Sequence, residues 1–121
     1  SNNFGVDYSF GGKKINFDNQ YYIYGTSIDN LINEEVLEVP DYIKIDVDGI
    51  EHLILRGAKK TLQNSKIKSI LIEVQEDFVE QFENIKMILN ENNFQLTSKN
   101  QSERYINHPK FKNSYNYIYK R

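Results

Sequence analysis

Apolar residues follow two different spacings along this chain of 121 residues. Residues 42–47 and 69–74 are short, nearly continuous apolar runs, which are typical of buried β-strands. Apolar residues recur every three or four positions over residues 50–62 and 77–91, which predicts two helices with one apolar face each. Strands that alternate with helices favour an α/β fold with a mostly parallel sheet.

The segments around this alternation extend it. Ser27 is a helix-start residue followed by helical spacing of apolar residues, which predicts a short helix over residues 27–35. Residues 94–97 and 115–119 have the composition of two closing strands. A long polar loop joins them, and we expect the two strands to form an antiparallel pair.

The first part of the chain is rich in aromatic residues and glycine. Residues 21–24 have the pattern of a strand that Gly25 ends, and we expect residues 1–25 to form an extended or hairpin lead-in. Residues 26–121 then form the α/β core. The length suits one hydrophobic core, so we expect a single domain over residues 1–121.

The composition limits the classes of partner. Hydrophobic residues make up 39% of the chain and charged residues 26%, which is typical of a globular protein. The formal net charge is -2 and no long basic run is interleaved with aromatic residues, so we expect no nucleic-acid partner. With no cysteine and two histidines, the chain lacks a plausible zinc ligand set, and we expect no metal. No apolar stretch approaches the roughly 20 residues of a membrane helix, so we expect a cytoplasmic protein with no membrane partner.

The apolar run over residues 42–47 leads into the most informative segment of the chain. Residues two apart on a strand share a face, so Lys44 and Asp46 project together at a spacing of about 6.6 Å. We expect them to form a buried ion pair, because a buried charge needs a partner. In open α/β sheets, ligands bind beyond the carboxyl ends of the strands. Asp46 and Asp48 follow such an end and are the first candidates for a site.

Four segments of the chain, taken in order, resemble the FkbM family of S-adenosylmethionine-dependent methyltransferases. They are Thr26-Ser27-Ile28-Asp29-Asn30-Leu31, residues 41–51, Leu55-Arg56-Gly57-Ala58 and Ile70-Leu71-Ile72-Glu73-Val74. In the family, a threonine–leucine–aspartate segment precedes a strand of the form Lys-Ile-Asp-Val-Glu-Gly. A helix with a Lys/Arg-Gly-Ala element and a strand ending in glutamate follow. This chain departs mildly from that pattern, with Asp48 in place of Glu and Ile50 in place of Ala.

The resemblance implies a partial Rossmann-like class I methyltransferase fold in which residues 42–47 form the fourth strand. The family's fold begins with a strand and a glycine-rich turn that holds the methionine moiety, and no segment of this chain matches them. The resemblance therefore implies the C-terminal half of such a domain, with an incomplete site for S-adenosylmethionine. We expect the 121 residues alone to be inactive and to bind the cofactor too weakly to measure.

The same resemblance implies roles for individual residues. Asp46 would lie close to the cofactor methyl group and the substrate hydroxyl, as the catalytic residue that accepts the proton or orients the reacting group. Asp46 and Asp48 are the candidate cofactor-binding residues, and Glu73 is the candidate substrate-binding residue. The implied acceptor is a small molecule or glycan, methylated on a hydroxyl of a sugar or natural product.

Structural interpretations of these residues remain open. Asp46 and Asp48 can cap the helix that follows them, because acidic groups suit the positive end of the helix dipole. Glu51 and Glu73 can likewise be structural. His52 lies in the first turn of the helix, where we expect it to be exposed and without a role.

Two other functions also remain open. Asp46-Val47-Asp48-Gly49 is similar to the nucleophile motif of haloacid dehalogenase-like phosphatases, in which Asp46 would attack phosphorus and Asp48 would act as acid and base with magnesium. That family ends its next strand with Thr or Ser, whereas this chain has Glu73 near that position. Alternatively, the chain is a non-catalytic folding or oligomerisation unit. An exposed apolar edge along residues 42–47 would then favour a homo-oligomer.

Overall fold

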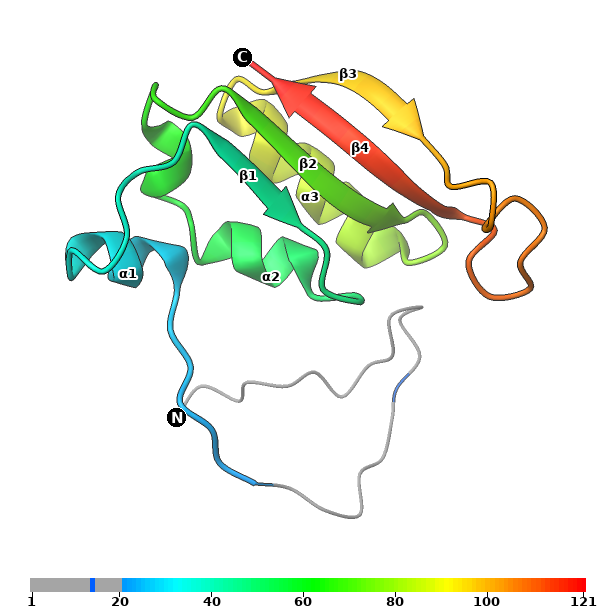
Figure 1. Ribbon diagram of the computed structural model, residues 1–121, viewed down its shortest axis with the longest axis horizontal. Helices are drawn as coiled ribbons and strands as arrows, with labels where there is room; N and C mark the ends of the chain where they lie inside the picture. Colours follow the sequence, from blue (N-terminus) through cyan, green and yellow to red (C-terminus); the bar gives the residue numbers. More distant parts are fainter. Residues whose placement is uncertain (1–13, 15–20) are drawn as a thin grey trace.

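The computed structural model describes residues 14 and 21–121, and its centre is a four-stranded sheet (Figure 1). The strands are β1 (Tyr42–Ile45), β2 (Ser69–Gln75), β3 (Gln95–Asn100) and β4 (Ser114–Lys120). They lie side by side in the order β1-β2-β4-β3. β1 and β2 pair in parallel, whereas β4 pairs antiparallel with both β2 and β3.

The sheet is mixed, so the prediction of a mostly parallel sheet is wrong. The prediction of an antiparallel closing pair is confirmed, because β3 and β4 are antiparallel. The difference arises because β4 lies between β2 and β3 and is antiparallel to both of them. The loop of residues 101–113 returns the chain without a helix, and a strand joined by such a loop pairs antiparallel with its neighbour.

The helices are α1 (Ile28–Asn33), α2 (Glu51–Arg56) and α3 (Val79–Glu91), and the 3-10 turn η1 (Thr61–Gln63) follows α2. α2 and α3 cover one face of the sheet (Figure 1). The helices expected over residues 27–35 and 77–91 are confirmed with slightly shorter ends. The apolar face expected over residues 50–62 is divided between α2 and η1.

The core lies between the sheet and these two helices. Its fully buried members include Ile70, Ile72 and Val74 of β2, Leu55 of α2, and Ile85 and Leu89 of α3. Successive side chains of a strand point to opposite faces, so Leu71 and Glu73 lie on the other side of β2, where they are only half-buried. β2 therefore presents an apolar side to the helices and a partly open side that leads to Glu73.

Hydrogen bonds join the first turn of α1 to the segment that follows α2. The Asp29 carboxylate accepts hydrogen bonds from the backbone N–H groups of Lys60 and Thr61 at 2.9 Å and from the Thr61 hydroxyl at 2.6 Å. The backbone N–H of Asp29 donates to the Gly57 carbonyl at 3.0 Å. A Cβ atom at Gly57 would lie 3.1 Å from that of Ser27, so glycine permits this close approach. These contacts join two of the segments that carry the FkbM resemblance, residues 26–31 and residues 55–58. They therefore give a structural reason for the spacing between those segments.

The strand expected over residues 21–24 is absent from the structure, so that prediction is wrong. Tyr21 and Tyr22 are 84% and 103% exposed, and residues 21–27 have no regular secondary structure. A strand is stabilised by pairing with a neighbour, and residues 21–24 pair with no described strand. The remainder of the expected lead-in lies outside the described residues, apart from Lys14.

Candidate functional site

Asp46 and Glu73 are brought together by the parallel pairing of β1 and β2. Ile45 pairs with Ile72, so the residues that follow each of them lie at the same level on neighbouring strands. Their carboxylates are close enough for the charge of Asp46 to raise the pKa of Glu73. The structure thus places two of the predicted site residues beside each other at the carboxyl end of β1.

Asp46 carries an ion pair with Lys44, as the two-residue spacing predicted. Lys44 Nζ lies 3.0 Å from Asp46 Oδ2, and the side chains are 65% and 43% exposed. The expectation of a buried pair is therefore wrong, because β1 is an edge strand of the described sheet and its outer side is open to solvent. The hydrogen bond from Lys44 lowers the pKa of Asp46, and partial burial opposes that shift only in part. Asp46 is therefore an ionised hydrogen-bond acceptor near neutral pH.

Glu73 has the opposite electrostatic environment. Burial raises the pKa of its carboxyl group, and the negative charges of Asp46 and Glu51 raise it further. The Ser114 hydroxyl donates a hydrogen bond to Glu73 Oε1 at 2.9 Å and opposes this shift. Two adjacent carboxyl groups whose pKa values move apart are a common arrangement for separate acid–base and positioning roles.

The turn after β1 has an unusual backbone conformation. Asp48 has φ 54° and Gly49 has φ 111°, and both values lie in the left-handed region. Gly49 suits such a conformation because it has no Cβ, and aspartate tolerates it better than most residues. The turn exposes Asp48 and directs the chain into α2.

Glu51 holds this turn in place. Its Oε1 accepts the backbone N–H of Val47 at 3.2 Å, and its Oε2 accepts that of Gly49 at 3.0 Å. Gln81 Nε2 of α3 also donates to Glu51 Oε2 through a short hydrogen bond. Burial raises the pKa of Glu51, which is 2% exposed, and these N–H donors oppose that shift. The structural interpretation of Glu51 is thereby supported by its contacts.

The capping interpretation of Asp46 and Asp48 is wrong. The N-cap of α2 is Ile50, and no side chain forms a cap hydrogen bond there. Asp46 is instead engaged with Lys44. The exposed Asp48 borders the cavity described next, so neither carboxylate is occupied by the helix terminus.

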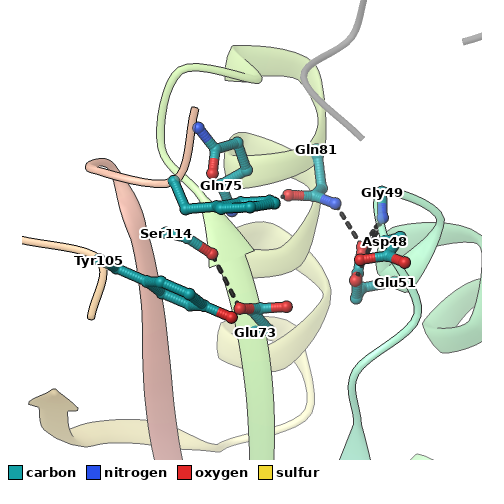
Figure 2. Close-up of a pocket in the computed structure, with 9 residues that line it drawn as sticks. Asp48, Gly49, Glu51, Glu73, Gln75, Gln81, Tyr105 and Ser114 are labelled. Carbon is teal, nitrogen blue, oxygen red and sulfur yellow. Dashed lines mark hydrogen bonds between the residues drawn. The ribbon is translucent and has the colours of Figure 1, made fainter. Parts of the chain in front are cut away.

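A small cavity of about 80 Å³ opens at this edge of the sheet (Figure 2). Its lining includes Asp48, Glu51, Glu73, Gln75, Tyr105 and Ser114. The carboxylates come from the turn after β1, from α2 and from β2, and Tyr105 comes from the loop of residues 101–113. Figure 2 shows the Tyr105 ring extending toward Glu73. Asp46 is not among the described residues that line the cavity. Its neighbour Glu73 lines the cavity and lies between Asp46 and the cavity.

Gln75 contributes a buried acceptor to this cavity that the sequence did not reveal. The residue is 6% exposed, and its Oε1 has no hydrogen-bond partner among the described residues. Its backbone N–H donates to Gln81 Oε1 at 3.1 Å, which holds the end of β2 against α3. The i+2 spacing from Glu73 is the one signal that could have indicated Gln75. No local pattern indicates Tyr105 or Ser114.

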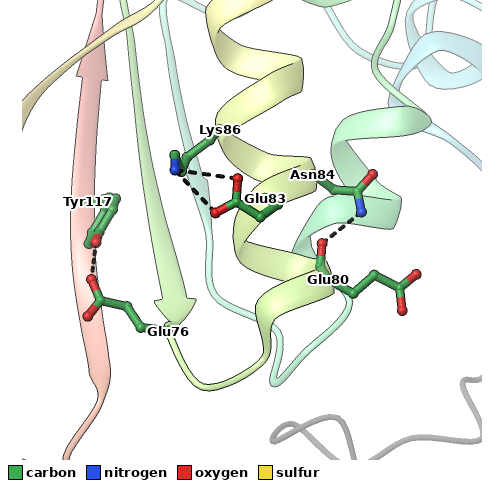
Figure 3. A network of polar contacts seen from close by, with 6 residues as sticks. All are labelled: Glu76, Glu80, Glu83, Asn84, Lys86 and Tyr117. Carbon is green, nitrogen blue, oxygen red and sulfur yellow. Dashed lines mark hydrogen bonds and ion pairs between the residues drawn. The ribbon is translucent and has the colours of Figure 1, made fainter.

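Glu76, one residue beyond β2, is a carboxylate whose pKa is shifted in the opposite direction to that of Glu73. Tyr117 donates a short hydrogen bond to Glu76 Oε1 (Figure 3). Lys99 Nζ lies 2.6 Å from the same oxygen. Burial tends to raise the pKa of Glu76, but the hydrogen bonds from Lys99 and Tyr117 outweigh it, so the pKa is lowered. Glu76 is therefore a structural ion-pair partner.

His52 is buried, so the prediction of an exposed side chain is wrong. It is 5% exposed, and its ring meets that of Phe78 edge-on with centroids 5.9 Å apart. The first turn of α2 faces the start of α3 here, which covers the imidazole. Burial lowers the pKa of His52. His52 is not among the residues that line the cavity.

Comparison with known families bears on the class of protein to which this chain belongs. The family model of the FkbM methyltransferase domain matches residues 7–96. The chain belongs to the FkbM methyltransferase family. No curated protein and no solved structure gives a significant match. The FkbM match covers both Asp46 and Glu73, and it favours a methyltransferase over a haloacid dehalogenase-like phosphatase.

The FkbM match is wider than the resemblance in the sequence. It begins at residue 7, ahead of residue 26, and ends at residue 96 within β3. It therefore includes much of the segment expected to be a lead-in and excludes β4. Ser114, which donates to Glu73, lies beyond the matched range.

The described residues do not enclose S-adenosylmethionine, the methyl donor implied by the FkbM resemblance. Pockets that bury a ligand of that size measure roughly 300–1,000 Å³, whereas the cavity here measures about 80 Å³. The described residues alone therefore form no cavity of the size that such a cofactor requires. Within that described part of the chain, no group of three or more His, Cys, Asp or Glu residues could hold a metal ion. None of its helices combines the length and apolarity that a membrane crossing requires.

Proposed function

We propose that this chain is an FkbM-family O-methyltransferase domain that uses S-adenosylmethionine to methylate a hydroxyl group on a sugar or natural-product acceptor. Membership of the family supports methyl transfer. The observation that supports the position of the acceptor is the pair Asp46 and Glu73, whose pKa values are shifted in opposite directions at the carboxyl end of β1 and β2. S-adenosylmethionine supplies the methyl group when bound.

The two carboxylates have different roles toward the acceptor hydroxyl: Glu73 accepts its proton and Asp46 orients it. A general base functions best when its pKa is close to the operating pH, so the raised pKa of Glu73 suits it to receive the hydroxyl proton. The lowered pKa of Asp46 keeps it ionised, which suits it to orient the hydroxyl by accepting a hydrogen bond. Ser114 fixes the rotamer of Glu73 through its hydrogen bond.

Methyl transfer by the natural gene product that contains these residues tests this proposal. Labelled S-adenosylmethionine and a panel of neutral methyl glycosides should give label on a glycoside oxygen. Glu73→Gln should lower kcat by about 10²- to 10⁴-fold, the usual contribution of a general base. Asp46→Asn should have a smaller effect, because an amide can still accept a hydrogen bond. Absence of transfer, or equal losses in both variants, would contradict the proposal.

Cofactor binding by the 121 residues alone is a separate question. The size of the described cavity supports the prediction that this chain binds S-adenosylmethionine too weakly to measure. Calorimetric titration answers it directly. Tight binding at one molecule per chain would overturn that prediction and leave the acceptor-side proposal unaffected.

The open edge of β1 supports a second proposal, self-association of this chain. β1 pairs with β2 on one side only within the described sheet, and Tyr42 on it is 71% exposed. Exposed apolar strand edges favour pairing between copies, and an edge lysine opposes it. In sedimentation, Tyr42→Lys should shift the chain toward monomer, whereas Leu96→Lys on the more polar edge strand β3 should not. A clean monomer without any substitution would contradict this proposal.

A further inference from the structure

The imidazole of His52 is a buried titratable group that the proposed methyl transfer does not use. The residue is 5% exposed, and its Nδ1 atom has no hydrogen-bond partner among the described residues. Its ring meets that of Phe78 edge-on, with centroids 5.9 Å apart. Buried polar atoms are almost always hydrogen-bonded in folded proteins, so an unpaired imidazole nitrogen in this position needs a physical explanation.

The packing around His52 favours the neutral imidazole. Protonation places a hydrogen on both ring nitrogens, and Nδ1 would then be a charged donor without an acceptor among the described residues. A buried charge without a partner is far more costly than a buried neutral group. A proton on His52 therefore favours a conformation in which the ring leaves Phe78 and reaches water or an acidic group.

The charged groups around His52 act in both directions. Burial lowers the pKa of His52, the positive charge of Arg56 lowers it further, and the negative charge of Glu80 opposes them. Asp77, which precedes α3, already accepts a hydrogen bond from the Asn113 amide at 2.6 Å. Glu80 is exposed in the first turn of α3. Glu80 is therefore the acidic group that an imidazolium can meet once the ring has left its buried position.

His52 is the next residue after Glu51, which holds the turn after β1. Glu51 Oε1 accepts the backbone N–H of Val47 at 3.2 Å, and Oε2 accepts that of Gly49 at 3.0 Å (Figure 2). Both residues lie in the first turn of α2, so a movement of the His52 ring away from Phe78 also displaces Glu51. Burial raises the pKa of Glu51, so Glu51 also titrates on this turn and an experiment has to separate the two groups.

We propose that His52 is a proton-driven switch for the turn after β1. The neutral ring keeps α2 packed on Phe78 and the turn closed, whereas the protonated ring leaves this contact, pairs with Glu80 and releases residues 46–49. The closed turn holds Asp46 and Asp48 in place, and the open turn does not. The opening needs no ligand, and only its consequence, loss of methyl transfer in mild acid, rests on the proposed function.

The sign of the pH dependence follows from the two environments of His52. Its pKa is lowered in the closed turn, so the open form binds a proton first as the pH falls. The opening equilibrium should shift by up to about tenfold per pH unit between about pH 6.5, the ordinary histidine value, and the lowered pKa. Above that ordinary value, the turn should stay closed whatever the pH.

Native-state hydrogen exchange in the 121-residue chain measures this opening without any methyl donor. The Gly49 amide, which is buried and bonded to Glu51, reports on the turn, and the Ile72 amide in the centre of the sheet reports on global unfolding. The protection factor of Gly49 should fall about five- to tenfold between about pH 7.5 and about pH 5.5 and recover when the pH is restored. That of Ile72 should stay within about twofold.

Substitutions of the two histidines assign the opening to His52. His52→Phe keeps an aromatic ring against Phe78 and removes the titratable nitrogens, so the protection of Gly49 should then change by less than about twofold over the same pH range. His52→Leu is a smaller second variant and should give the same result. His108→Asn changes the other histidine of the chain and keeps an acceptor for the two backbone N–H groups that bind Nδ1 of His108. It is the matched control and should keep the full effect.

Three results would each overturn the switch. They are unchanged protection of Gly49 in the unmodified chain, an equal loss of protection at Ile72, and a loss that persists in both His52 variants. The last result would assign the opening to Glu51.

Failure of the switch is distinguishable from failure of the proposed function. Opening that depends on His52, together with no methyl transfer by the gene product, would remove the proposed function and leave the switch standing. Methyl transfer whose kcat does not fall as Gly49 opens would overturn the regulatory role of His52 and leave the methyltransferase standing.

Discussion

The two ends of β2 satisfy their polar groups in opposite ways. At the amino end, the guanidinium of Arg121 donates to the carbonyls of Ile67 at 3.0 Å and Leu62 at 2.7 Å, and it lies 4.3 Å from the centroid of the Phe94 ring. At the carboxyl end, Gln75 Oε1 is buried without a partner among the described residues, beside a cavity with several carboxylates. The same strand thus begins in a saturated hydrogen-bond network and ends in an unsaturated one.

This difference separates groups that stabilise the fold from groups that are available to a ligand. A side chain whose donors or acceptors are all used by the protein contributes mainly to the free energy of unfolding. A buried acceptor without a partner costs stability, and such costs are retained mainly at functional sites. The comparison therefore predicts which substitutions change stability and which change binding alone.

Glu51 gives the strongest test of this comparison. Its carboxylate is fully hydrogen-bonded, although it lies near the carboxyl end of β2, where Gln75 Oε1 has no partner among the described residues. Glu51→Gln places an amide NH₂ against the N–H donors of Val47, Gly49 or Gln81, and we expect a loss of about 2–3 kcal/mol in the free energy of unfolding. Urea denaturation measures this loss. The exposed Glu83→Gln is the control and should change stability by less than about 0.5 kcal/mol. A neutral Glu51→Gln would break the distinction between saturated and unsaturated groups.

Arg121 gives the next largest effect. Arg121→Met removes the hydrogen bonds to the carbonyls near η1 and should cost about 1–2 kcal/mol, since part of this network is exposed to solvent. Thermal or urea unfolding measures the change. Arg104→Met, an exposed arginine of the loop of residues 101–113, is the matched control. Equal stability of the two variants would show that the amino end of β2 is no more stabilised than the surface.

Gln75 should give the smallest effect on stability. Gln75→Met removes an unpaired buried acceptor and keeps the backbone hydrogen bond to Gln81, so we expect a change within about 0.5 kcal/mol, with stabilisation as the favoured sign. The measurement is the same urea denaturation. A loss above about 1 kcal/mol would show that the Gln75 side chain is structural, and the contrast between the two ends of β2 would then disappear.

Local patterns in the sequence were sufficient for the elements and for part of the site. Helical spacing located α1 and α3, because the apolar face that a helix buries is visible in a short window. Asp46 and Glu73 were identified because strand ends can be recognised locally, and the parallel pairing of β1 and β2 then placed them together.

Local sequence patterns could not predict which distant strands pair with each other. The position of β4 between β2 and β3 depends on contacts between distant residues, so the mixed sheet was not predicted. The same pairing sets Gln75 opposite Ser114, which is why the polar lining of the cavity was missed. His52 was misjudged because its burial depends on how α2 meets the residues before α3.

The most direct test of the account is a carboxyl-detected NMR titration of Asp46 and Glu73 in the folded chain. The account predicts that the hydrogen bond from Lys44 lowers the pKa of Asp46 below its ordinary value and that burial raises the pKa of Glu73 above its own. By linkage, the contribution of Asp46 to stability is lost as pH falls through its lowered pKa, and that of Glu73 is lost as pH rises through its raised pKa. A pKa for Glu73 at or below that of Asp46 would contradict the assignment of Glu73 as proton acceptor and Asp46 as the positioning group.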